Sequence, residues 1–216
     1  MTIKPTESMK PSASIGEFAE LIAAGTPAPG GGSVAAYCGV LATSLGRMMC
    51  NLTMGKTKYA AVEGRVEEID SELRRLGDEF RSLIDDDAES FNDVLAAYRL
   101  PKDSEEAKAE RSRKIETALR HAIDTPYHTA ELAVETLDLL GELAALGNPN
   151  ALPDLTNGAQ LARTAVRGAY YNVEVNLAGL TDAAAAADIR TKIAALVEHS
   201  ERLSSQVEAA FKKQAL

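Results

Sequence analysis

The sequence has no tryptophan, only two cysteines, and an aromatic share of 5% over its 216 residues. Because large rings are scarce and alanine is abundant, the composition favours closely packed helices over strands. No segment alternates apolar and polar residues between turn signals, as a half-buried strand would. We therefore expect an all-α fold, built as a single-domain helical bundle with a buried central apolar helix.

The cysteines, Cys38 and Cys50, are too far apart to pair within one helix, where the rise per residue would separate them by roughly 18 Å. Reduced thiols and a cytoplasmic location are the simpler interpretation. Residues 1–13 are polar, contain two prolines and lack the apolar core of a secretory signal. We expect them to form a disordered arm that precedes one domain, residues 14–216.

Positive charge is also scarce, since 23 Lys and Arg face 32 Asp and Glu for a formal net charge of −9. No stretch concentrates enough basic residues to bind nucleic acid. A local pocket can still oppose the overall sign and bind a small anion. The three histidines, His121, His128 and His199, have no metal-ligand spacing, and no metal is expected.

One segment, residues 34–53, is apolar on nearly every side and by length alone admits a membrane span. Thr43, Ser44 and Arg47 interrupt it, and no positively charged flank sets an orientation. A helix buried at the centre of a bundle is therefore favoured over a membrane span.

Capping and breaking residues predict where the other helices begin and end. Ser14 and Glu17 have capping-box spacing, Ser33 and Ser104 are candidate N-caps, and Gly147 is a candidate C-cap. Pro126 is expected to start a new helix and Asp154 to cap another. The predicted helices are residues 15–25, 34–53, 61–98, 104–125, 126–147, 154–177 and 182–211.

The helix at residues 61–98 has apolar residues in alternating steps of four and three, with one exception. The apolar positions are Val62, Val66, Ile69, Leu73, Leu76, Phe80, Leu83, Phe91, Val94 and Tyr98. Asp87 occupies a slot of this series, four residues from both Leu83 and Phe91. A carboxylate that faces a core needs a partner or a raised pKa. Either Asp87 is functional, or the helix rotates and lets it reach water beside Asp85 and Asp86.

Two loops and one helix carry the other candidate residues. Pro29, Gly30, Gly31, Gly32 and Ser33 form a turn that allows close approach of a ligand, or only a tight connection. This turn lacks the lysine and the preceding strand of a nucleotide-phosphate loop.

At the second loop, Asn148, Asn150 and Asp154 precede a helix rich in small residues, and Asp154 could be a plain helix cap. Further along that helix, Asn172 and Asn176 lie one turn apart on a shared face. They could bind a ligand or join two helices.

Taken together, the segments PAPGGGSVAA, CNLTMGKTKY, DAESFNDVLAAYRLPK, GNPNALPD and RGAYYNVEVNL resemble the cyclodeaminase/cyclohydrolase family. The resemblance covers about residues 14–180. It implies an all-helical homodimer that binds a folate substrate and uses no metal or redox cofactor. The family often has serine before the aspartate of the Asn-Pro-Asn loop, where this chain has Pro153.

The resemblance also implies roles for matching residues. Asp87 would transfer protons with its pKa set by an apolar slot and by Lys58, and Asp154 would hold the pterin or the reacting nitrogen. The glycine-rich turn, Pro29 to Ser33, would lie beside the pterin, and Asn150, Asn172 and Asn176 would supply neutral hydrogen bonds. Arg167 would meet the glutamate tail.

Two reactions fit this resemblance. A methenyltetrahydrofolate cyclohydrolase adds water to the one-carbon unit of 5,10-methenyltetrahydrofolate and forms 10-formyltetrahydrofolate. A formimidoyltetrahydrofolate cyclodeaminase lets N10 attack the formimino carbon and releases ammonia. Each passes through a tetrahedral carbon and needs a positioned group to take and return protons. The competing hypothesis is a folate-binding helical module without turnover.

Overall fold

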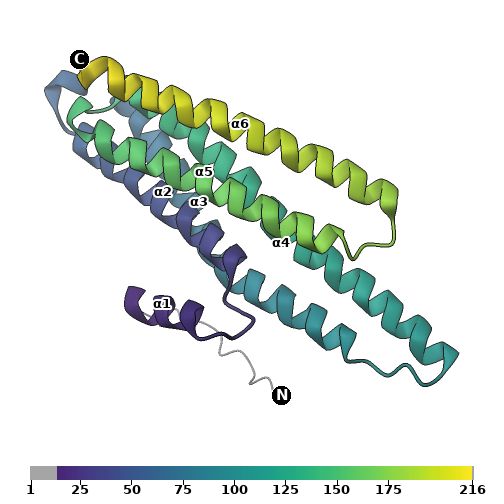
Figure 1. The fold of residues 1–216 in the computed structure, drawn as a ribbon. Coiled ribbons are helices and arrows are strands. Elements are labelled where there is room, and N and C mark those ends of the chain that lie inside the picture. Colours follow the sequence, from purple (N-terminus) through teal and green to yellow (C-terminus); the bar gives the residue numbers. More distant parts are fainter. Residues whose placement is uncertain (1–13, 216) are drawn as a thin grey trace.

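The structure, a computed structural model, describes residues 14–215, so the arm expected at residues 1–13 lies outside the described residues (Figure 1). Within 14–215 the chain is helical and contains no strand, which confirms the all-α prediction. The elements are α1 (Ile15–Ala23), α2 (Gly31–Thr53), the 3₁₀ turn η1 (Thr57–Tyr59), α3 (Glu63–Tyr98), α4 (Glu105–Leu146), the 3₁₀ turn η2 (Pro149–Ala151), α5 (Leu152–Leu177) and α6 (Ala183–Ala215).

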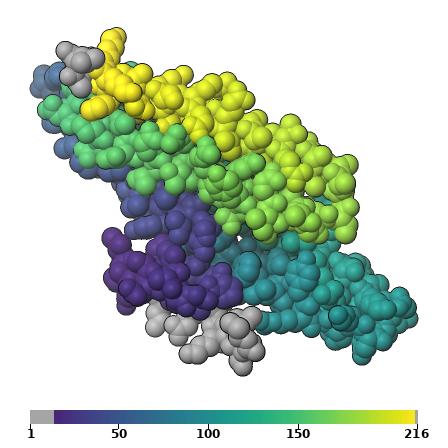
Figure 2. All heavy atoms as spheres, viewed as in Figure 1, coloured from purple at the N-terminus to yellow at the C-terminus, as the bar shows by residue number. Residues whose placement is uncertain are grey.

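The helices α2 to α6 run back and forth as a bundle, in which α2 contacts α3, α4 and α5, while α6 packs on α4 and α5 (Figure 1). The helix α1 lies beside the start of α2, where Phe18 meets Tyr37 edge to face with ring centroids 5.3 Å apart. The turn between α3 and α4 projects beyond the ends of α5 and α6 (Figures 1 and 2).

The predicted register of α3 is confirmed over its first two thirds. Val66, Ile69, Leu73, Leu76 and Phe80 are completely buried. Beyond them α3 enters the projecting hairpin, where a small cluster formed with α4 replaces the main core. This explains why two aromatic residues of the same apolar series, Phe91 and Tyr98, are exposed.

The helix α2 packs closely because small residues face its neighbours. A side chain at Gly39 would place its Cβ only 2.4 Å from the Phe80 ring, so glycine is required for this contact. The expectation that α2 is buried on every side is wrong, because one stripe remains open where no described helix covers it. Leu41 and Leu45 are half-buried there, and Met48 and Leu52 are exposed. Among the described residues, no helix has the length and apolar character needed to cross a membrane.

The prediction of two helices separated at Pro126 is wrong, since α4 continues through this residue. Proline lacks the N–H that would bond to the carbonyl four residues earlier, here that of Ala122. The side chain of Asn176 on α5 replaces this donor, with its amide nitrogen 2.6 Å from the Ala122 oxygen. The helix survives because a residue 54 positions further along the chain satisfies its free carbonyl.

The predicted helix ends are partly confirmed. Ser14 and Glu17 form the capping box, Ser104 caps α4, and Gly147 follows its last residue. Two predicted caps are wrong. Gly30 is the N-cap of α2, which leaves Ser33 inside the helix. The helix α5 begins at Leu152, directly after η2, and therefore Asp154 lies in its first turn rather than before it.

Candidate functional site

A cavity of about 160 Å³ lies where the start of α2 meets α3, α4 and the end of α5. Its lining combines the glycine-rich turn with residues from the three other helices: Pro27, Ala28, Gly30, Gly31, Gly32, Asp87, Ser90, Phe91, Ala122, Asn172, Val175 and Asn176. The structure thus brings together Asp87, the glycines and both asparagines, which the sequence placed in separate motifs. Asp87 is the only ionisable side chain in this lining.

Asp87 is half-buried, and its carboxylate lies against the first turn of α2. The Ser33 hydroxyl donates to Asp87 Oδ2 over 2.9 Å and also lies 3.1 Å from the Ile84 carbonyl oxygen. Burial raises the pKa of Asp87, while hydrogen bonds from the hydroxyl and the backbone N–H of Ser33 lower it. The carboxylate therefore accepts a hydrogen bond from the backbone N–H of Ser33 in the first turn of α2. The N-cap residue, Gly30, cannot do so because it has no side chain.

Gly32 sets the position of this carboxylate. A Cβ built on Gly32 would lie 1.9 Å from Asp87 Oδ1 and 2.5 Å from its Cγ. The carboxylate fills the space of the missing side chain, so a larger residue would force Asp87 to move. The turn is thus more than a tight connection, because its glycine allows the acid to approach the helix backbone.

Asn172 and Asn176 line the cavity, and both amide nitrogens are bonded within the protein. Asn172 Nδ2 donates to the Gly168 carbonyl oxygen over 2.9 Å, and Asn176 Nδ2 donates to that of Ala122. These bonds hold both side chains in fixed positions at the wall. Asn176 therefore serves the helix joint at Pro126 as well as the cavity, which combines the two interpretations that the sequence left open.

The other predicted site residues do not reach this cavity within the chain. Lys58 is exposed on η1, beyond the far end of α2, where its Nζ lies 5.1 Å from the centroid of the Tyr59 ring. The length of α2 puts it about 35 Å from Gly32. The expected influence of Lys58 on the pKa of Asp87 is therefore wrong for a single chain, where burial and Ser33 cause the shift.

Asn150 and Asp154 also lie at that far end, on η2 and the first turn of α5. Asn150 donates its backbone N–H to Asn148 Oδ1, and Asn148 binds the Leu52 carbonyl at the end of α2. Pro153 fits the first turn of α5, where a backbone N–H has no acceptor within the helix, so its missing donor costs the helix nothing.

Arg167 lies outside the cavity lining and faces α6, where its guanidinium donates to Glu201 over 2.8 Å. Pro29 and Ser33 are buried next to the lining without forming part of it. Six further wall residues did not stand out as site residues in the sequence: Pro27, Ala28, Ser90, Phe91, Ala122 and Val175. Ser90 lies three residues from Asp87 on α3, and that helical spacing could have identified it.

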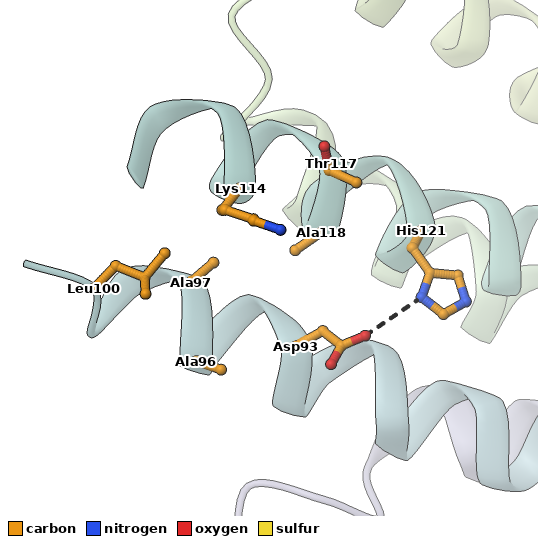
Figure 3. A pocket seen from close by; sticks show the side chains of 8 residues that line it. All are labelled: Asp93, Ala96, Ala97, Leu100, Lys114, Thr117, Ala118 and His121. Atoms are coloured by element: carbon orange, nitrogen blue, oxygen red, sulfur yellow. Dashed lines mark ion pairs between the residues drawn. The ribbon is translucent and has the colours of Figure 1, made fainter. Parts of the chain in front are cut away.

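A larger cavity of about 490 Å³ lies between the end of α3 and the start of α4 (Figure 3). It shares no residue with the Asp87 cavity and contains none of the predicted site residues. Asp93 and His121 form an ion pair across it at 3.8 Å (Figure 3). Both side chains are mostly exposed, so this contact contributes little to stability.

The cysteines are free and poorly suited to nucleophilic catalysis. Burial raises the pKa of Cys38, and burial together with the charge of Asp70 raises that of Cys50 to about 12. Both thiols therefore stay protonated at neutral pH. Among residues 14–215, no three His, Cys, Asp or Glu side chains are placed so that they could hold a metal ion.

A family model described as formiminotransferase-cyclodeaminase matches residues 14–195. The chain belongs to this family. It is 35% identical over 190 residues to the methenyltetrahydrofolate cyclohydrolase of Methylorubrum extorquens, an alignment that covers 88% of this chain and 91% of that protein.

Two further relatives place the chain within the formiminotransferase-cyclodeaminase family. The chain is 34% identical to the formimidoyltransferase-cyclodeaminase of Rattus norvegicus over 90% of its own length, but it spans only 36% of that protein. The crystal structure of formiminotetrahydrofolate cyclodeaminase from Thermotoga maritima superposes with a TM-score of 0.82 at 26% identity, covering 95% of this chain and 98% of that one.

Proposed function

We propose that this protein is a methenyltetrahydrofolate cyclohydrolase, which converts 5,10-methenyltetrahydrofolate and water to 10-formyltetrahydrofolate. The observation that supports this best is the Asp87 cavity, in which a single carboxylate is held among neutral groups. Such a site suits a substrate whose reacting carbon carries positive charge. The relationship to the cyclohydrolase of Methylorubrum extorquens, which extends over 91% of that protein, supports the same reaction.

In this mechanism Asp87 takes a proton from the water that attacks the one-carbon unit, and a neutral tetrahedral adduct forms. The protonated carboxyl then gives this proton to N5 as the bond between N5 and the carbon breaks. The adduct hydroxyl releases its own proton to water and becomes the formyl oxygen. Burial favours this exchange because it brings the pKa of Asp87 closer to neutral pH. The steps need neither a metal nor a redox cofactor.

A cyclodeaminase is the second candidate, since the Thermotoga maritima relative with this name covers the same fold at 98% of its length. In that reaction N10 attacks the carbon of the formimino group in its protonated form, CH=NH2+. Asp87 moves the proton from N10 to the resulting NH2 group, and ammonia departs as the methenyl cation forms. The carboxylate has the same task on a different tetrahedral carbon. We infer a homodimer for either reaction, and its free cysteines are consistent with a cytoplasmic location.

Kinetics on the purified protein test this proposal. We expect loss of methenyltetrahydrofolate absorbance, and Asp87→Asn should reduce kcat by roughly 10² to 10⁴. Ammonia release from the formimino substrate would instead identify the cyclodeaminase. Folate binding without either product would establish the non-catalytic module. Near wild-type turnover by a folded Asp87→Asn protein would show that Asp87 does not transfer the proton.

A further inference from the structure

Both asparagines of the Asp87 cavity have a side-chain oxygen that the protein leaves unused. Their amide nitrogens donate to the carbonyl oxygens of Gly168 and Ala122, which fixes which end of each amide is the oxygen. Among residues 14–215, no group donates a hydrogen bond to either oxygen. Neither oxygen is buried without a partner, so each remains open to a ligand or to water.

Asn172 and Asp87 contact consecutive residues at the start of α2. A Cβ built on Gly32 would lie 1.9 Å from Asp87 Oδ1, and one built on Gly31 would lie 3.6 Å from Asn172 Nδ2. The two side chains therefore reach the same turn of α2, one from α3 and the other from α5. The cavity of about 160 Å³ that they line has room for a few water molecules, since a water occupies about 30 Å³ in the liquid.

The fold itself has little need for the Asn172 amide. Its nitrogen donates to the carbonyl four residues earlier in the same helix, and the backbone N–H of Asn172 serves that carbonyl already. Losing the side-chain bond would thus leave no polar group without a partner. Asn176 differs, because its bond joins α5 to α4 and replaces the donor that Pro126 lacks. The free oxygen of Asn172 is therefore the feature that calls for a function.

The hydrolysis of a one-carbon unit needs two hydrogen-bond acceptors around the attacking water. One acceptor, Asp87, takes the proton that leaves as the new bond forms. The second hydrogen also needs an acceptor, because a water held at one point rotates and turns its lone pair away from the carbon. A neutral amide oxygen suits this second position, since it accepts a hydrogen bond without competing with the carboxylate for the proton.

We propose that Asn172 holds the attacking water, with its side-chain oxygen accepting one hydrogen while Asp87 accepts the other. This inference rests on the proposed function, whose nucleophile it places. As the water oxygen bonds to the one-carbon unit, one hydrogen passes to Asp87 as a proton and the other stays on the adduct hydroxyl, bound to Asn172. The substrate enters from the rim of the cavity, where Val175 is 74% exposed and Phe91 is 38% exposed.

Two substitutions at Asn172 separate this role from a structural one. Asn172→Leu removes the oxygen at similar size, so kcat should fall about 100-fold while KM changes by less than about threefold. Asn172→Asp also loses the amide nitrogen but keeps an oxygen, and it should retain at least about 10-fold more turnover than Asn172→Leu. Equal turnover of the two variants would show that Asn172 acts through the fold alone, and the proposal would fail.

The pH dependence of Asn172→Asp adds a second readout. Asp87 is the only ionisable side chain in the wild-type lining, so this variant places a second carboxylate in the same cavity. Like charges favour protonation, and the acidic limb of kcat/KM should therefore move to higher pH. An unmoved limb would show that the side chain of residue 172 does not face Asp87, which contradicts the shared water.

Thr164→Val is the matched control for Asn172→Leu. Thr164 is exposed on α5, outside the cavity lining, and donates to the Gln160 carbonyl oxygen four residues earlier over 2.8 Å. Its replacement removes the same kind of helix bond without touching the cavity, and both kcat and KM should stay at their wild-type values. Wild-type turnover by a folded Asn172→Leu protein would overturn the proposal.

A crystal structure keeps this inference separate from the proposed function. Substrate-free crystals at high resolution should show a water within about 3.2 Å of both an Asp87 oxygen and Asn172 Oδ1, and crystals of Asn172→Leu should lack it. This water in a protein that leaves methenyltetrahydrofolate unchanged would support the water site and refute the cyclohydrolase alone. Turnover by a wild-type protein whose crystals lack the water would refute the role of Asn172 alone.

Discussion

Replacing Gly32 by alanine tests whether the fit between α2 and Asp87 supports catalysis. The new Cβ would lie 1.9 Å from Asp87 Oδ1, where an ordinary van der Waals contact needs at least 3.4 Å. Since 3.4 − 1.9 = 1.5, the carboxylate has to move by about 1.5 Å. This movement takes it away from the Ser33 hydroxyl and out of its place in the cavity.

The expected effect is large on turnover and modest on stability. A misplacement of about 1 Å in a catalytic group can cost roughly 10² in rate, so kcat of Gly32→Ala should fall about 100-fold or more. A lost hydrogen bond to a charged group costs about 1.5–3 kcal/mol, and the helix preference for alanine offsets up to about 1 kcal/mol. We therefore expect the free energy of unfolding to fall by about 1–2 kcal/mol.

The assay is the loss of methenyltetrahydrofolate absorbance, with urea unfolding measured in parallel. Gly64→Ala on α3 is the matched control, because nothing lies within 4 Å of its added Cβ. The control should keep full turnover and gain up to about 1 kcal/mol of stability. Wild-type kcat in Gly32→Ala would show that the position of this carboxylate does not determine the rate, and the reasoning would fail.

Three further predictions follow from the site. Ser33→Ala removes the hydroxyl hydrogen bond that lowers the pKa of Asp87 but keeps the bond from the backbone N–H, so the acidic limb of kcat/KM against pH should move to higher pH. An unmoved limb would exclude an effect of the Ser33 hydroxyl on this carboxylate. Burial raises the pKa of Asp87 in the folded protein, so the free energy of unfolding of the wild type should decrease as pH rises from the ordinary Asp range through the raised pKa. Asp87→Asn should lack this decrease, which urea unfolding at several pH values measures. Asn176→Ala leaves the Ala122 carbonyl without its donor and should lower the free energy of unfolding by about 1–3 kcal/mol. Adding Pro126→Ala to the same chain should recover part of this stability, because the new backbone N–H can donate to Ala122.

Local signals predicted much of this fold because short segments contain the information that sets them. The capping box at Ser14 and the apolar spacing of α3 depend on residues within a few turns; the capping box is confirmed, and the spacing is confirmed over the first two thirds of α3. Pro126 failed as a helix start because the donor that rescues α4 comes from Asn176 on α5. The local sequence around Pro126 does not show that a distant residue supplies this hydrogen bond. The rule for proline therefore predicts a helix break that tertiary contacts prevent.

The candidate site shows the same boundary between local and long-range information. The apolar series of α3 identified Asp87 because a carboxylate in a core-facing slot conflicts with its neighbours. The same series could not reveal that Ser33 and Gly32 receive it, since their positions depend on how α2 crosses α3. Motif order also gave no distance between Asp87 and Lys58, which the length of α2 holds apart. Because the distance between two motifs depends on the helix that joins them, the structure alone shows that Lys58 lies on η1, outside the lining of the Asp87 cavity.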